Sequence, residues 1–282
     1  MGDGFTALHR AAAFGTAREV AELVAEVDDV DVLFDDRTAL WQAVHRRNYD
    51  SVGVLLAAGA DPARPMMSGW SPARLSLTTA HPIATGEVLT PRERAAVAER
   101  DRLVAALGRF PDVDGFSIAC VRGVGSDEAV RRLDAEVVPD DEVPDLANPW
   151  DDPFGDDTEV VVGVTDVPGG CVVLQPWSYT ASIPAITRAL SAGTVTCGMY
   201  ANPKSGNQGS IDRDGETVDR DLHPGGSPDS ADSTADVLLK HLYVRHAVAC
   251  CCAYAGLRPE DDRAFTSPAR WVVLPDRVRW EL

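Results

Sequence analysis

The sequence predicts two regions of different fold class, a short stack of helical repeats followed by an α+β domain with a mostly antiparallel sheet. The stack is indicated by a repeat, because Thr38-Ala39-Leu40-Trp41-Gln42-Ala43 follows Thr6-Ala7-Leu8-His9-Arg10-Ala11 after 32 residues. Each copy then continues into an apolar tract of helical period. Beyond residue 114, strand-like and helix-like segments alternate, which indicates an α+β domain. A chain of 282 residues is long enough for both regions.

Each repeat begins with a helix cap. The hydroxyl group of the first Thr accepts a hydrogen bond from the first helical turn, and Gly59 permits a left-handed exit after the second repeat. A weaker copy begins at Ser71, 33 residues after Thr38. With this period, and with openers close to the pattern Thr-Pro-Leu-His-x-Ala, the segment resembles the ankyrin repeat family. The resemblance implies about three repeats over residues 1–110, the last one irregular, which stack because one helix pair cannot bury its apolar face alone.

The last repeat is interrupted before its second helix. Thr90-Pro91-Arg92-Glu93 predicts a helix start, with Thr as the cap, Pro at the first position and Glu completing a capping box. We expect this helix to run to about Phe110 and to close the stack, which makes residues 83–89 an insertion.

The ankyrin resemblance also implies a binding surface, formed by hairpin fingers and the first helix of each pair. Residues 31–37 and 63–70 are the expected fingers. Large apolar and Arg side chains are typical of binding hot spots. The candidate protein-binding residues are Phe34, Arg46, Arg47, Met66, Met67 and Trp70. Alternatively, the apolar members of this set pack against the next domain, because exposed apolar patches are unusual on a monomer.

Residues 114–282 are expected to form the α+β domain, with helices on one face of the sheet. A Gly/Pro/Ser/Asp linker is expected over residues 223–233, followed by one long helix from Thr234 to Tyr254. The expected strands cover residues 116–121, 159–165, 171–175, 194–201, 210–212, 216–219 and 271–274, and the shorter helices cover residues 126–133 and 182–190.

Short motifs in this half match a second family. Val121-Arg122-Gly123, Gln175-Pro176-Trp177 and Asp214-Gly215-Glu216 resemble an actinobacterial domain family of uncharacterised function, over residues 114–275. Because that family has no assigned chemistry, the resemblance implies a fold unit and no activity.

The negative charge is concentrated in the second half. The net charge of the chain is −18, of which residues 1–110 carry −3 and residues 111–282 carry −15. Eleven acidic and no basic residues lie in 134–159, so we expect a flexible acidic loop over residues 134–158. Such a surface repels phosphate backbones, which disfavours nucleic-acid binding, and it attracts a partner with a basic surface.

The sequence favours a cytoplasmic location. No apolar run approaches the ~18 residues of a membrane helix, and Met1-Gly2-Asp3-Gly4 has no features of a secretory leader. The six Cys residues lack disulfide-type spacing, which fits reduced thiols, and the bias towards Arg and Ala is typical of a high-GC bacterial genome. We therefore expect no membrane partner.

We find no catalytic motif and expect no cofactor and no metal. Gly123-Val124-Gly125 imitates a dinucleotide loop, but Glu128 stands at the third glycine position. His246 and Cys250 lie four residues apart, and two ligands do not make a zinc site. The ligand pocket candidates are Gln175, Trp177 and Tyr179, which follow the end of an expected strand and could equally be core.

The sequence favours a non-enzymatic protein that binds another protein through the concave face and fingers. A sharper form is an immunity or antitoxin protein that masks a basic effector. Alternatively, residues 114–282 form an enzyme or a small-ligand-binding domain, with the repeats as a tether. In a third possibility the repeats are only structural, and residues 114–282 bury their concave face.

Overall fold

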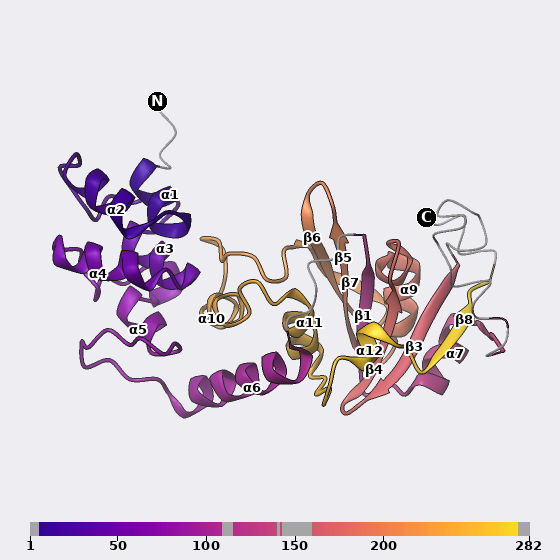
Figure 1. Ribbon diagram of the computed structural model, residues 1–282. Helices are drawn as coiled ribbons and strands as arrows, with labels where there is room; N and C mark the ends of the chain where they lie inside the picture. Colours follow the sequence, from indigo (N-terminus) through magenta and orange to yellow (C-terminus); the bar gives the residue numbers. More distant parts are fainter. Residues whose placement is uncertain (1–5, 109–114, 140–141, 143–159, 276–282) are drawn as a thin grey trace. The chain divides into compact units, whose positions relative to one another are not determined.

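The chain folds into two units. The computed structural model describes residues 6–108, 115–139, 142 and 160–275 (Figure 1). The repeat unit consists of residues 1–98 and 226–244, and the sheet unit consists of residues 99–225 and 245–282. This division differs from the expected domains, 1–110 and 114–282, because residues 226–244 pack on the repeats. Local sequence patterns do not report such a long-range contact.

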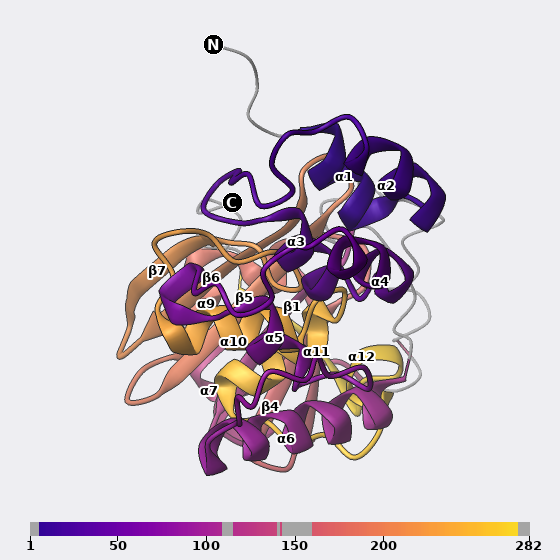
Figure 2. The same ribbon diagram turned by 90° about the vertical axis from the view of Figure 1, so that its left-hand side faces the viewer.

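The repeat unit contains the helices of the predicted stack and, in addition, α10, which was predicted as part of the second domain (Figures 1 and 2). They are α1 (Ala7–Phe14), α2 (Ala17–Val24), α3 (Ala39–Arg46), α4 (Tyr49–Ala57), the 3-10 turn η1 (Met67–Gly69), α5 (Pro72–Ser76), the beginning of α6 (Pro91–Leu107) and α10 (Thr234–Leu242).

All three repeats begin with the predicted cap. The hydroxyl group of Thr6 accepts from the backbone N–H of His9, Thr38 accepts from Trp41, and Ser71 accepts in the same way. The third position of each repeat holds Leu8, Leu40 and Ala73, and all three are fully buried. The first helices α1, α3 and α5 pack in succession, as expected for stacked repeats.

Helix α6 has the predicted capping box. The backbone N–H of Thr90 donates to Glu93 Oε2 at 2.7 Å, and the N–H of Glu93 donates to Thr90 Oγ1 at 3.3 Å. The helix ends at Leu107, and the expected end at Phe110 lies outside the described residues. Only its first part belongs to the repeat unit, so the helix does more than close the stack.

In the described part of the sheet unit, eight strands form one sheet in the order β2-β8-β3-β4-β1-β5-β6-β7, and every pair is antiparallel. This confirms the predicted α+β class. The strands are β1 (Ser117–Arg122), β2 (Glu136–Val137), β3 (Val161–Val167), β4 (Gly170–Gln175), β5 (Val195–Asn202), β6 (Gly206–Arg213), β7 (Glu216–Leu222) and β8 (Arg270–Val273). The helices are the end of α6, α7 (Ser126–Leu133), the 3-10 turn η2 (Thr180–Ser182), α9 (Pro184–Leu190), α11 (Ala247–Ala255) and α12 (Arg263–Thr266).

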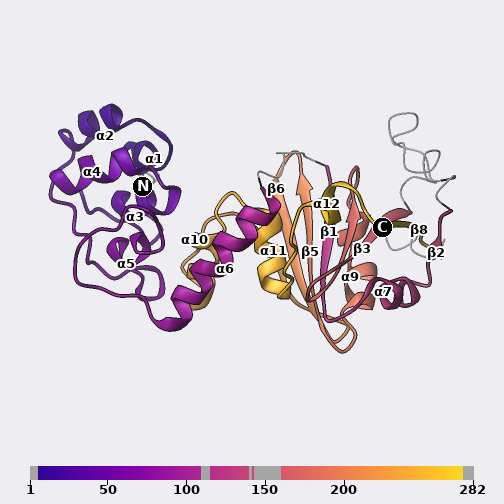
Figure 3. The same ribbon diagram turned by 60° about the horizontal axis from the view of Figure 1, so that its bottom comes forward.

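Helices cover both faces of the sheet, and the expectation of one covered face was wrong. On β1, Ala119 and Val121 pack in a core with α7 and α9. Successive strand residues point to opposite faces, so Cys120 points the other way, where α11 packs on β1 and β5 (Figure 3). The sequence pattern hid this because a strand that is buried on both faces is apolar throughout.

The expected long helix is two helices, α10 and α11, which belong to different units. Between them Arg245 has a left-handed φ of 64°, and its backbone N–H donates to the carbonyl oxygen of Gly225 at 2.9 Å. The apolar period continues across the break because each helix buries a face, α10 in the repeat unit and α11 on the sheet.

Two further expectations concern the acidic loop and membranes. Strand β2 pairs with β8 at Glu136 and Val137, so residues 136–137 are not part of a loop. Most of the remaining expected loop, residues 140–141 and 143–158, lies outside the described residues.

In the described ranges, no helix is long and apolar enough to cross a membrane.

Candidate protein-recognition surface

The two predicted fingers are present as hairpins beside the first helices of the repeats. Phe34 pairs with Arg37 in the first hairpin, and Met66 pairs with Trp70 in the second. Each hairpin directly precedes a capped helix, α3 or α5, so the cap fixes its direction. We call the surface formed by both fingers and the C-terminal end of α3 the recognition face.

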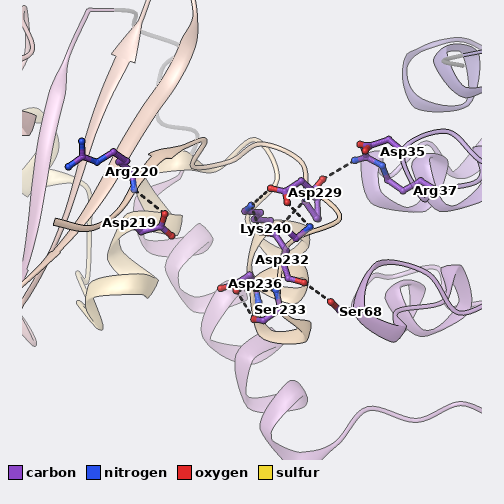
Figure 4. A network of polar contacts seen from close by, with 12 residues as sticks. Asp35, Arg37, Ser68, Asp219, Arg220, Asp229, Asp232, Ser233, Asp236 and Lys240 are labelled. Carbon is purple, nitrogen blue, oxygen red and sulfur yellow. Dashed lines mark hydrogen bonds and ion pairs between the residues drawn. The ribbon is translucent and has the colours of Figure 1, made fainter. Parts of the chain in front are cut away.

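The recognition face is covered by residues 226–244 of the same chain, which we call the strap. Three side chains of the fingers donate hydrogen bonds to main-chain carbonyl oxygens of the strap. Arg37 Nη1 lies 2.9 Å from the oxygen of Pro228, Ser68 Oγ lies 2.5 Å from that of Asp232, and Trp70 Nε1 lies 2.9 Å from that of Thr234. Figure 4 shows Ser68 directed at Asp232.

Two arginines at the end of α3 bind the two ends of the strap. Arg46 Nη2 donates to Ser227 Oγ at 2.9 Å, and Arg47 Nη2 donates to the carbonyl oxygen of Leu242 at 3.1 Å. The guanidinium of Arg46 also lies 4.9 Å from the ring centroid of Phe14, a cation–π distance. Both arginines were predicted as protein-binding residues, and both contact the strap.

The apolar candidates are buried within the repeat unit. Met66, Met67 and Trp70 are 7%, 4% and 0% exposed, and η1, which contains Met67, packs against α10. Phe34 is half-buried and meets the ring of His9 edge-on, with the centroids 6.0 Å apart. The alternative for these apolar side chains was burial against another part of the chain. The strap is the part of the chain that packs against the second finger.

The strap is held in shape by its own charges. Ser233 and Asp236 form a capping box at the start of α10. Lys240 Nζ lies 2.6 Å from Asp232 Oδ1 and 3.4 Å from Asp229 Oδ2 (Figure 4). Burial lowers the pKa of Lys240, but the two carboxylates together raise it above its ordinary value, so the ammonium group stays charged.

Two buried histidines join α3 to the strap. His45 Nδ1 lies 3.2 Å from His241 Nδ1, and His241 Nε2 lies 2.9 Å from Thr78 Oγ1. The His45 ring also stacks on Trp41, with the centroids 5.2 Å apart. Burial, followed by the field of His241, lowers the pKa of His45 well below its ordinary value, so this imidazole is neutral.

The ligand pocket candidates all have contacts inside the sheet unit. Gln175 is fully buried, and its amide donates to the carbonyl oxygen of Val161 at 3.1 Å and accepts from the backbone N–H of Thr180 at 2.9 Å. Trp177 stacks on Trp271, with the centroids 5.6 Å apart. Tyr179 meets Tyr200 edge-on. Gln175 thus has the core role that the sequence left open, whereas Trp177 is partly buried and Tyr179 is exposed.

His246 is the residue before α11, without a capping hydrogen bond from its side chain to that helix, and Cys250 lies in the first turn of the helix. In the described part of the chain, no group of three or more His, Cys, Asp or Glu side chains is placed to hold a metal ion. All six Cys residues are buried free thiols, and burial raises the pKa of Cys171 to about 12. Such thiols behave as core side chains.

Sequence reasoning missed the strap and, with it, the buried pair of His45 and His241. It placed Arg37 in the first finger but did not name it among the candidate residues. The strap left only indirect signals in the sequence, the capping pair Ser233 and Asp236 and a short apolar period after them. These signals predict a helix and do not identify the surface on which it packs.

Two family models match the chain. The ankyrin repeat model matches residues 35–65, which hold the second repeat and parts of both fingers. A model described as a family of unknown function, DUF6461, matches residues 100–246, which include most of the sheet unit and the whole strap. No curated protein matches the chain. Ankyrin repeats are associated with protein–protein interaction in general.

Proposed function

The chain belongs to DUF6461, a family of unknown function, and from this premise we propose that it is a non-enzymatic protein that acts by binding another protein. The repeats supply the recognition face, and the sheet unit supplies negative charge. The use of the Gln175 amide by main-chain groups supports a structural role for this side chain over a ligand-binding one.

One observation carries this proposal. Finger side chains Arg37, Ser68 and Trp70 bind main-chain carbonyl oxygens of a segment that lies 164 to 191 residues further along the chain. Main-chain carbonyls are present in every polypeptide, so donors fixed in this way suit recognition of a protein segment. The contacts are therefore of the kind that a partner protein can also make.

The finer form of the proposal concerns the partner. Residues 111–282 carry a net charge of −15, which attracts a protein with a basic surface and increases its association rate. An immunity or antitoxin protein that masks a basic effector fits this charge. We place the protein in the cytoplasm, where its six free thiols remain reduced.

The test is capture from the native host with the tagged full chain. The wild type is compared with Leu238→Asp, which places a charge on the buried side of α10, and with Ala235→Asp, which places the same charge on an exposed position of α10. Captured proteins are identified by mass spectrometry, purified and tested for direct binding at low and high salt. We expect one partner that binds directly, that has a basic surface and that is released by salt.

Two results would contradict the proposal at different levels. If the proteins that bind directly never have a basic surface, the immunity form of the proposal is excluded. The general proposal of protein binding then still stands. In the structural alternative, residues 114–282 bury the concave face, and the strap over the recognition face fits this as well. That alternative predicts that neither the wild type nor either variant retains a protein, and this result would remove the proposed function itself.

A further inference from the structure

We propose that the recognition face binds an acidic turn leading into an amphipathic helix of a partner protein, and that the strap is an intrachain copy of this ligand. The strap then keeps the face covered until a partner segment displaces it. This inference rests on the proposed function and adds the chemistry of the ligand and its competitor. It is argued from the backbone contacts, the charges and the helix face of the strap.

The backbone contacts follow the path of a turn into a helix. The oxygen of Pro228 is bound before the turn, that of Asp232 is bound just before the helix cap, and that of Thr234 is bound at the first helical residue. Ser68 also accepts a hydrogen bond through its own carbonyl oxygen, from Thr234 Oγ1 at 3.0 Å. The face therefore selects a chain path, with a hydroxyl group favoured at the start of the helix.

Charge links the strap to the face at one acidic residue. A hydrogen bond from the backbone N–H of Ala231, together with the charges of Lys240 and Arg37, lowers the pKa of Asp229. The guanidinium groups of Arg37, Arg46 and Arg47 themselves donate to uncharged oxygens of the strap. Residues 226–244 contain three acidic residues and a single Lys. An acidic segment is thus favoured here, whereas a basic surface is attracted by the sheet unit. The two charge preferences belong to different units and can be met by different parts of one partner.

The helix of the strap binds through one apolar side. Val237, Leu238 and Leu242 are 0%, 8% and 1% exposed, and α10 packs against η1 of the second finger. Placing an amphipathic helix against an apolar surface is a recurrent mode of peptide recognition. These three buried side chains of α10 define an apolar pattern at positions i, i+1 and i+5.

The strap is able to leave the face as a closed loop. Its flanking residues Gly225 and Arg245 are joined by a backbone hydrogen bond of 2.9 Å, and both belong to the sheet unit. Detachment of residues 226–244 therefore leaves this bond and α11 in place. A tethered ligand has a high effective concentration, so it reduces the apparent affinity of any free competitor for the face.

The test uses a fluorescently labelled synthetic peptide of residues 226–244 and the full-length protein. Anisotropy gives the dissociation constant for the wild type, Leu238→Asp and Ala235→Asp. We expect Leu238→Asp to bind the peptide at least about tenfold more tightly than the wild type, because its own strap no longer competes. Ala235→Asp should match the wild type. Changing the three Asp residues of the peptide to Asn should weaken binding to Leu238→Asp.

A second loosened variant, Ser68→Ala/Lys240→Met, removes strap contacts without burying a charge and replaces Leu238→Asp if that chain fails to fold. Circular dichroism verifies folding in each case. The proposal is overturned if folded, loosened chains bind the peptide no better than the wild type. It is also overturned if the wild type is a dimer that becomes monomeric with Leu238→Asp, because the occupant is then the strap of a second copy. A host partner captured by a chain that ignores the peptide would leave the proposed function intact and remove only this inference.

Discussion

His45 Nδ1 on α3 lies 3.2 Å from His241 Nδ1 on the strap, and both side chains are fully buried. A single proton can be shared between these two nitrogen atoms, one ring donating and the other accepting. Two protonated rings at this distance would repel each other strongly in this buried site. Arg37, Arg46 and Arg47 add further positive charge around His45. The docked strap therefore requires His45 to be neutral.

The first prediction is that acid loosens the strap. Docking lowers the pKa of His45, so the undocked state binds the extra proton. Docking stability is therefore constant above the ordinary histidine pKa of 6.5 and falls as the pH drops below it. The free energy of opening should decrease by up to about 1.4 kcal/mol per pH unit. Hydrogen exchange of the α10 amides between pH 7.5 and 5.5, corrected for intrinsic exchange, measures it.

His45→Gln should reduce this pH dependence. The matched control is His223→Gln, which changes an exposed histidine of the sheet unit and should keep the full dependence. If the free energy of strap opening changes equally with pH in the wild type and in His45→Gln, the histidine pair does not control the strap.

The second prediction concerns the two lysines of the chain, Lys204 and Lys240. Lys240→Met removes ion pairs to Asp229 and Asp232, and the Asp232 side chain is only 12% exposed. The loss should lower the free energy of strap opening by about 1 kcal/mol, near the upper end for a partly exposed pair. Lys204→Met makes the same charge change at an exposed position and should have no effect. Amide exchange of α10 distinguishes the two variants.

The third prediction separates a structural role of Gln175 from a ligand-binding role. Gln175→Leu keeps an apolar body but leaves the oxygen of Val161 and the N–H of Thr180 without their partner. We expect a loss of about 2–4 kcal/mol in sheet-unit stability, measured by denaturant unfolding. Gln208→Leu, at an exposed position of β6, serves as the control. A stable Gln175→Leu chain would reopen the ligand-binding alternative.

The fourth prediction uses two glycines that have ordinary φ angles. A Cβ at Gly163 on β3 would lie 2.3 Å from Pro268 Cγ, so Gly163→Ala should strongly destabilise the sheet unit. A Cβ at Gly53 on α4 meets nothing within 4 Å, and Gly53→Ala should stabilise the repeat unit by about 0.5–1 kcal/mol. Thermal unfolding of both variants tests the opposite signs.

Much of the fold was predictable because its signals are local. The caps at Thr6, Thr38 and Ser71 and the capping box of Thr90 and Glu93 lie within four residues of the groups they satisfy. Most strands followed from turn residues and alternation in the same way, and the fingers followed from the repeat register of the ankyrin resemblance. The repeat period fixed the register of Arg46, Arg47 and Trp70, which all contact the strap, and their role in binding a partner protein stays a prediction.

The sequence by itself determined the repeat architecture, the α+β class, the charge imbalance and the position of the fingers. Only the tertiary structure decided that residues 226–244 cover the recognition face and that one helical pattern divides into α10 and α11. The physical reason is that the apolar period of a helix specifies which of its faces is buried but does not specify the surface on which that face packs. The contact between His45 and His241 spans 196 residues, and no local pattern encodes it.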